Sequence, residues 1–227
     1  MKCILFILLL ASSVFAEELP PAPQILAAAR AQLPPHPVHM TGVLKQWTAN
    51  GFMKKALDVE MELDWRAEPP SAKYRISDEA GKVFQTLEIS WKNGRPDYLF
   101  SQNEEKRAFD PHAEIENMGL TWSDLSFSFL WSQEAQTLGI EKKFGKERFK
   151  ISVPRPENRS LRLWVEKETG RLVKAEEVDA AGNRKKIIKV VSVKEFDGLW
   201  MVKDLDIIRL EQGGRTSLRV DHVEVRP

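Results

Sequence analysis

The sequence predicts a mainly β (α+β) fold, in which a strongly curved antiparallel sheet forms a half-open barrel and short helices cover its concave face. Three observations lead to this prediction. Apolar and polar residues alternate with a period of two along many segments, which is typical of strands with one dry and one wet face. Turn residues, mostly glycine and asparagine, separate these segments. No segment between successive strands has the length of a crossover helix, so we expect neighbouring strands to pair as hairpins.

The first residues of the chain have the pattern of an export signal. Lys2 precedes the apolar run Ile4–Leu10, and Val14 and Ala16 stand at the −3 and −1 positions of a cleavage site. The apolar run is shorter than the roughly 20 residues that cross a bilayer. We therefore expect residues 1–16 to be a cleaved signal peptide. The mature protein is then expected to be soluble in the periplasm, without a stable transmembrane anchor.

The cysteine and charge content argue against several classes of function. The only cysteine, Cys3, lies in the expected signal peptide, so no disulfide, thiolate nucleophile or cysteine-bound metal is expected in the mature chain. The 34 basic and 33 acidic residues nearly balance, and removal of the signal peptide takes away one basic residue. A nucleic-acid partner is therefore not expected.

A short helix is predicted before the first strand. Apolar residues recur at helical spacing in Gln24–Leu33, and prolines flank this segment on both sides. We expect residues 17–37 to hold this proline-flanked helix and residues 38–227 to form the half-barrel. Helix and half-barrel together are expected to make a single domain.

The clearest predicted strand is Leu57–Trp65, in which apolar and charged residues alternate without a break. Further strands are expected at Val38–Trp47, Ala72–Ser77, Val83–Trp91, Asp97–Ser101, Ile140–Phe144, Arg148–Val153, Ser160–Glu166, Arg171–Val178, Lys185–Phe196, Trp200–Leu210 and Thr216–Val225. In the last of these, the alternation changes phase between Val220 and Val223. Either a bulge near Asp221 or His222 or burial of both faces explains the change.

The segment that follows Thr121 permits two interpretations. Thr121 and Asp124 have the spacing of a capping box, so we predict a helix over Leu125–Trp131. The large apolar side chains of the same segment also alternate with serines, almost as they would in a strand.

Four stretches of sequence resemble a known family. They are Gly119–Leu125 (GLTWSDL), Phe129–Trp131 (FLW), Leu161–Leu172 (LRLWVEKETGRL) and Asp197–Lys203 (DGLWMVK). Together they resemble uncharacterised members of the outer-membrane lipoprotein-sorting family, related in fold to LolA and LolB, over about Val38–Val225. The resemblance implies a half-open barrel with helices across its mouth and an apolar cavity for acyl chains. No individual arginine or lid residue of the characterised carriers can be matched, so none is carried over.

The predicted function is that of a periplasmic lipid- or lipoprotein-binding carrier without catalysis. The expected partners are the acyl chains of lipoproteins or lipids, an inner-membrane releasing complex and an outer-membrane acceptor. Most of the seven tryptophans are expected in the core, and a subset is expected to line the cavity. The predicted acyl-chain groove consists of Leu57, Val59, Met61, Leu63, Trp65, Leu87, Ile89, Trp91, Phe127 and Trp131. Charge alone marks the wet face of each strand, so which parity faces the groove stays open.

An alternative function uses the same scaffold. A periplasmic sensor or interaction domain, similar to the lipoprotein-like domain of RseB, would bind a protein or lipid signal without transporting it. Affinity for a lipid would in either case come from apolar burial, at about 0.8 kcal/mol for each methylene group.

No catalytic, cofactor or metal site is predicted. His36 and His39 have no evident third ligand, and we interpret both as part of an exposed, proline-rich connection. Asp204 with Asp206, or the pair Glu176–Glu177, have the residue type of a glycosidase acid and nucleophile, but a wet sheet face explains them more simply. The sequence contains no nucleophile elbow, phosphate loop or dinucleotide fingerprint.

Overall fold

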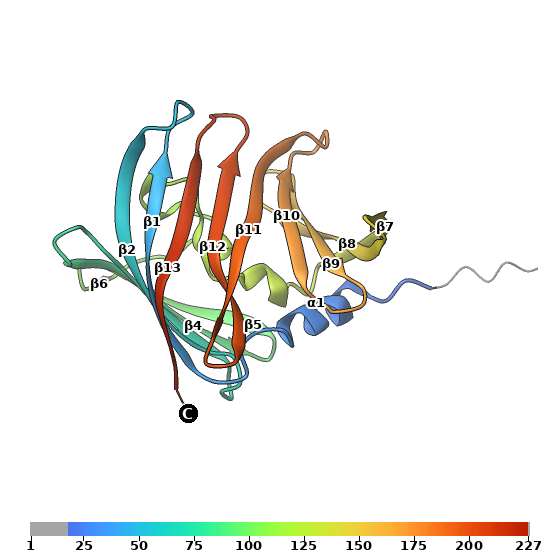
Figure 1. Ribbon diagram of the computed structural model, residues 1–227, viewed down its shortest axis with the longest axis horizontal. Helices are drawn as coiled ribbons and strands as arrows, with labels where there is room; N and C mark the ends of the chain where they lie inside the picture. Colours follow the sequence, from blue (N-terminus) through green and yellow to red (C-terminus); the bar gives the residue numbers. More distant parts are fainter. Residues whose placement is uncertain (1–17, 227) are drawn as a thin grey trace, which may run out of the picture.

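The computed structural model describes residues 18–226. The predicted signal peptide, residues 1–16, lies outside the described residues. Within them, one antiparallel sheet contains 13 strands (Figure 1). The strands are β1 (Val38–Trp47), β2 (Met53–Asp64), β3 (Ser71–Ser77), β4 (Val83–Lys92), β5 (Arg95–Gln102), β6 (Glu105–Lys106), β7 (Gln136–Lys143), β8 (Lys146–Arg155), β9 (Arg159–Glu166), β10 (Leu172–Val178), β11 (Arg184–Phe196), β12 (Leu199–Arg209) and β13 (Arg215–Val225). The helices are α1 (Ala22–Arg30) and α2 (Trp122–Leu125), with the 3-10 helices η1 (Ile115–Asn117) and η2 (Ser128–Trp131).

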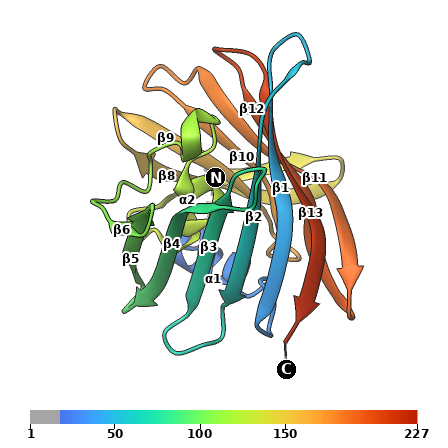
Figure 2. The same ribbon diagram turned by 90° about the vertical axis from the view of Figure 1, so that its left-hand side faces the viewer.

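The sheet consists of two meanders that meet at the first and last strands. Strand β1 pairs with β2 on one side and with β13 on the other, both antiparallel. Figure 2 shows β1 and β13 side by side in the middle of the curved sheet. The strand order runs from β6 at one edge to β7 at the other, so the barrel does not close. The predicted half-open antiparallel barrel is therefore confirmed.

Alternating burial explains why these segments form strands. In β1 every second side chain is buried, and in β2 Leu57, Val59 and Met61 are buried. A strand with this pattern presents one apolar face, and the curved sheet turns all of these faces inward. Strand β2 ends at Asp64, so Trp65 lies just beyond it, in the turn that leads to β3.

The phase change in the last strand is a β-bulge. Thr41 of β1 lies opposite His222, whereas its neighbour Gly42 lies opposite Val220, so Asp221 is the extra residue on β13. This confirms the bulge interpretation. A Cβ atom on Gly42 would lie 2.3 Å from the backbone oxygen of Arg219, and the close strand approach therefore requires glycine at this position.

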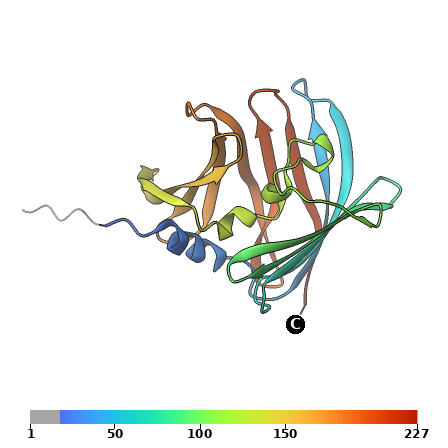
Figure 3. The ribbon, with the colours of Figure 1, turned by 180° about the vertical axis from the view of Figure 1, so that it is seen from behind.

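The chain between β6 and β7, residues 107–135, is called the covering segment. It joins one edge strand of the sheet to the other, and it passes through the concave side to do so (Figure 3). The predicted capping box is confirmed: the Thr121 hydroxyl accepts from the Asp124 amide, and the Asp124 carboxylate accepts from the Thr121 amide.

The predicted helix over Leu125–Trp131 is only partly right. Helix α2 ends at Leu125 after four residues, because Phe127 has a left-handed backbone conformation with φ 51°. The chain then makes one 3-10 turn, η2, and no strand forms here. Two short turns therefore replace the continuous helix.

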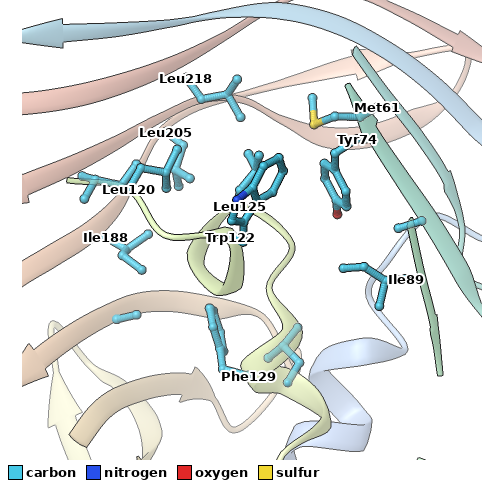
Figure 4. Packing of buried hydrophobic residues seen from close by; sticks show 14 of the residues in the cluster. Met61, Tyr74, Ile89, Leu120, Trp122, Leu125, Phe129, Ile188, Leu205 and Leu218 are labelled. Carbon is cyan, nitrogen blue, oxygen red and sulfur yellow. The ribbon is translucent and has the colours of Figure 1, made fainter. Parts of the chain in front are cut away.

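One apolar core joins the sheet, the covering segment and α1. Helix α1 packs against η2 and β7. Met61 and Tyr74 on one side of the barrel face Leu205 and Leu218 on the other, and Trp122 of α2 lies between them (Figure 4). The short helical elements thus cover the concave face, as predicted. Neither described helix has the length and apolarity to cross a membrane.

Candidate functional site

Six of the ten predicted groove residues lie buried on the concave face of strands β2 and β4. Leu57, Val59 and Met61 of β2 and Leu87 and Ile89 of β4 are each at most 4% exposed. Their burial shows that odd-numbered positions of β2 and β4 face inward. This settles the parity that charge alone left open.

The sixth buried residue, Trp91 of β4, contacts two other predicted residues, Trp65 and Trp131, where the covering segment meets the sheet. The ring centroid of Trp91 lies 4.3 Å from that of Trp131 and 5.2 Å from that of Trp65. Leu63 and Phe127 are half-buried against the same core. All of the predicted groove residues therefore belong to, or pack against, one apolar cluster. Side chains of the covering segment fill the concave side of the sheet within this cluster. That they bind an acyl chain stays a prediction.

Polar contacts attach the first part of the covering segment to the rim of the sheet. Gln46 of β1 donates to the backbone oxygen of Asn117 at 2.9 Å, and Lys55 forms an ion pair with Glu116 at 2.9 Å. The Thr216 hydroxyl of β13 donates to the backbone oxygen of Met118. Each of these contacts fixes the position of the segment without adding apolar burial.

A further backbone contact holds the other end. The guanidinium of Arg30 in α1 donates to the backbone oxygen of Leu130 and lies over the ring of Trp131, 5.5 Å from its centroid. Burial lowers the pKa of Arg30. Helix α1 thereby holds η2 through one hydrogen bond and one cation–π contact.

A buried cluster of charges lies beneath α2. The Asp124 carboxylate has no exposed side-chain surface and lies 2.6 Å from Lys186 Nζ and 3.5 Å from Arg155 Nη2. Glu177 lies 3.3 Å from Lys186. Burial alone would raise the pKa of Asp124, but the charges of Lys186 and Arg155 outweigh burial and hold the pKa below its usual value. Burial likewise tends to lower the pKa of Lys186, whereas Asp124 and Glu177 raise it, so Asp124 and Lys186 are both charged at neutral pH.

A polar pocket of about 260 Å³ opens beside this cluster. The covering segment forms one wall, and the loops and strand ends of β8–β12 form the other. The charged residues of these walls are Asp110, Glu114, Arg155, Glu157, Arg159, Glu177, Lys185, Lys186, Arg209 and Glu211, with His112 and Thr121 beside them. Sequence reasoning missed this pocket, because its residues come from distant segments that share no local motif.

The carboxylate pairs considered from sequence lie in different surroundings. Asp206 accepts from the Ser217 hydroxyl at 2.7 Å, and Glu176 pairs with Lys174 at 2.6 Å. Asp206 is 7% and Glu176 4% exposed, so a fully wet sheet face was the wrong explanation for these two.

The histidine interpretation needs one correction. His36 is exposed as expected, but His39 lies in β1, where its ring lies 2.8 Å from the Glu60 carboxylate. Residues 18–226 contain no group of three or more side chains that could hold a metal ion.

Comparisons with known proteins show which solved structures share this fold. A family model described only as an uncharacterized protein matches residues 113–227. No curated protein matches the chain. A LolA superfamily protein from Nitrosomonas europaea is 12% identical, with a TM-score of 0.71 over 92% of this chain and 95% of that one. A domain named for outer-membrane lipoprotein sorting, from Vibrio parahaemolyticus, is 14% identical, with a TM-score of 0.70 over 90% and 92%.

A third solved structure has the same architecture. A DUF1329 family protein from Desulfovibrio piger is 12% identical, with a TM-score of 0.68 over 90% of this chain and 91% of that one. At such low identities the likeness shows a shared fold. The expected resemblance to the lipoprotein-sorting fold is confirmed at that level.

Proposed function

We propose that this chain, which belongs to the family of uncharacterized proteins that matches residues 113–227, binds acyl chains of lipids or lipoproteins against the concave face of its sheet. One observation carries the proposal: a continuous apolar face is covered by a short, irregular segment instead of a second sheet. The LolA-like fold supports it, since a structure of this fold is named for outer-membrane lipoprotein sorting.

The covering segment has the properties of a displaceable element. Its α-helix and its second 3-10 helix contain four residues each. Elements this short contribute few internal hydrogen bonds, so they open at a lower free energy than the strands. The sheet needs no rearrangement when they move, because its own ladder of hydrogen bonds is complete without them.

An acyl chain would replace the apolar side chains that the segment places on this face. Trp122, Leu125 and Phe129 are each 3% exposed, and Trp122 lies between the two sides of the barrel (Figure 4). Each methylene group buried in their place contributes about 0.8 kcal/mol. Binding of this kind recognises apolar length and volume, so we expect broad specificity for the acyl chain and no chemical conversion of the ligand.

The proposal includes a location and partners. With the predicted signal peptide, the protein acts in the periplasm. An inner-membrane releasing complex and an outer-membrane acceptor are the partners that a carrier requires. Release then follows from differential affinity: a partner that stabilises the closed segment expels the ligand.

The first test is native mass spectrometry of the exported protein, purified from the periplasm without detergent and then extracted with solvent. We expect an additional mass of acyl-chain size that disappears after extraction. A protein free of any added mass, which also fails to bind palmitate and a diacylated lipopeptide, would contradict the proposal. A sensor that binds a protein signal on the same scaffold would then be the better account.

Matched variants locate the binding surface. Trp65 and Phe127 are half-buried in the predicted groove, so Trp65→Asp or Phe127→Asp places a charge there at a lower risk of unfolding. We expect at least tenfold weaker palmitate binding. Trp200→Asp is the control, because Trp200 is 64% exposed on β12. Equal binding by all three folded variants would refute this placement.

A further inference from the structure

The polar pocket lies on the other side of α2 from the apolar face. Thr121 lines the pocket, whereas Trp122 and Leu125 point into the core. The pocket therefore contacts the same covering segment as the proposed acyl site but presents different chemistry. Its binding properties can be argued without reference to acyl chains.

Every carboxylate on the pocket walls already has a partner within the described residues. Glu177 pairs with Arg159 at 3.1 Å, and Glu211 pairs with Lys185 at 2.5 Å. Glu157 lies 2.9 Å from a second nitrogen of Arg159.

The other two wall carboxylates bind backbone amides. Asp110 accepts from the His112 amide, and Glu114 accepts from the Gly119 amide, both at 2.8 Å. The carboxylates that line the pocket are thus all paired with cations or backbone amides of the protein.

Two arginines have donors left over. The Arg155 side chain is 5% exposed, and its Nε and Nη2 atoms are buried without a hydrogen-bond partner in the described structure. Its Nη2 lies 3.5 Å from Asp124 Oδ1, which is close enough for an ion pair but beyond an ordinary hydrogen bond. The Nε atom of Arg209 is also buried and without a partner there.

Both arginines are held in place by their surroundings. Arg155 donates through Nη1 to the Ser123 hydroxyl at 2.8 Å, and the same nitrogen lies 2.9 Å from His112 Nδ1. Burial and the charge of Arg155 lower the pKa of His112, so the ring is a neutral acceptor at pH 7. Gly119 lies directly on the Arg209 stem: a Cβ atom there would lie 2.3 Å from Arg209 Cδ.

From these donors we propose that the pocket binds a small oxyanion, a phosphate or carboxylate group, between Arg155 and Arg209. Each unsatisfied buried donor carries a penalty of about 1–3 kcal/mol, and more when the group is charged. An oxyanion is the ligand that removes this penalty, because it offers several acceptors and no competing donor, and guanidinium groups bind such planar or tetrahedral anions through paired hydrogen bonds. A free phosphate and a lipid head group share this chemistry.

The test is isothermal titration of inorganic phosphate, at low ionic strength, into the full exported protein and two variants. We expect saturable binding by the native protein. Arg209→Gln should weaken it at least tenfold, and Arg155→Gln should do so as well. Arg171→Gln, at an exposed arginine outside the pocket, is the matched control and should bind within twofold of the native protein.

Two results would overturn the proposal. The first is the absence of saturable binding for phosphate, sulfate and acetate, which would mean that water alone satisfies these donors. The second is native-like phosphate affinity in folded Arg209→Gln. Circular dichroism checks each variant, and if Arg155→Gln does not fold, Arg209→Gln decides the outcome.

Hexadecyl phosphate and hexadecanol distinguish the source of the anion. Tighter binding of hexadecyl phosphate than of inorganic phosphate, weakened by Arg209→Gln, would identify a lipid head group. Binding of inorganic phosphate alone would identify a free anion. Hexadecanol carries the chain without the anion, so its binding tests the apolar face separately from the pocket.

Discussion

Replacing Asp124 with asparagine is expected to lower the free energy of unfolding by about 3 kcal/mol at pH 7. Loss of one member of a buried ion pair leaves the other charge without compensation, which destabilises proteins by about 3–5 kcal/mol. We expect a loss at the lower end of this range, because Lys186 still has a second carboxylate partner, Glu177, at 3.3 Å. Asparagine has nearly the same shape and retains an oxygen that can accept from the Thr121 amide, so the capping box survives the change.

The pH dependence gives this prediction a second test. The pKa of Asp124 is lower in the folded protein than in the unfolded chain, so its stabilising contribution is complete above the unfolded value of about 4. The contribution is lost as the pH falls through the lower, folded value. The difference in stability between native protein and Asp124→Asn is therefore expected to be constant from pH 6 to about 8 and to shrink below about pH 4.

Urea unfolding followed by tryptophan fluorescence measures both effects. Asp97→Asn is the matched control: Asp97 also pairs with a lysine, Lys92 at 3.1 Å, but both side chains are 63% exposed. An exposed pair contributes about 0–1 kcal/mol, so the control should lose less than a third of what Asp124→Asn loses. Equal unfolding midpoints for the two variants would refute the conclusion that buried charges hold the covering segment.

Three further predictions concern the fold. Gly42→Ala places a methyl group against the Arg219 carbonyl oxygen at the bulge, and we expect about 2 kcal/mol lower stability in urea; an unchanged midpoint would contradict the close strand approach. Thr121→Ala removes the hydroxyl that caps α2 and should lower stability by about 1 kcal/mol, whereas Thr121→Ser should preserve it. Burial raises the pKa of Tyr74, so in an ultraviolet titration its phenolate should appear only together with alkaline unfolding, and ionisation of a folded Tyr74 near pH 10 would show that the side chain is accessible.

The sheet could be predicted because most strands show, within their own sequence, the alternation of apolar and polar residues that a half-buried sheet requires. A curved sheet with a dry concave side favours alternation of apolar and polar residues along its strands, and Leu57–Trp65 shows this alternation without interruption. Strand β6 escaped prediction, since two exposed residues carry no alternation. The break at Phe127 escaped for another reason: its left-handed conformation arises from packing in three dimensions, and phenylalanine has no intrinsic preference for it.

The apolar face and the buried charge cluster likewise differ in how far the sequence could predict them. The apolar residues of β2 and β4 could be identified as one surface, because burial follows strand parity. The charge cluster could not, since Lys186 lies 62 positions after Asp124 and on another element. Only the fold brings them together, and a capping-box aspartate is by itself an ordinary surface feature.

The buried ion pair between the covering segment and the sheet affects how much free energy the proposed displacement of this segment requires. Two charged side chains that are buried as an ion pair lose the free energy of their hydration, and their mutual attraction gives back little more than this loss. Well-packed apolar residues in the same place are therefore often equally or more stabilising. If the segment left the sheet, Asp124 and Lys186 would be hydrated again. The free energy of this hydration would offset much of the free energy lost with the broken ion pair. Apolar side chains at these positions would gain nothing on exposure. The buried charges thus fix where the segment sits while keeping the free energy of opening low. Under the proposed function, an acyl chain has to replace only the apolar contacts of Trp122, Leu125 and Phe129.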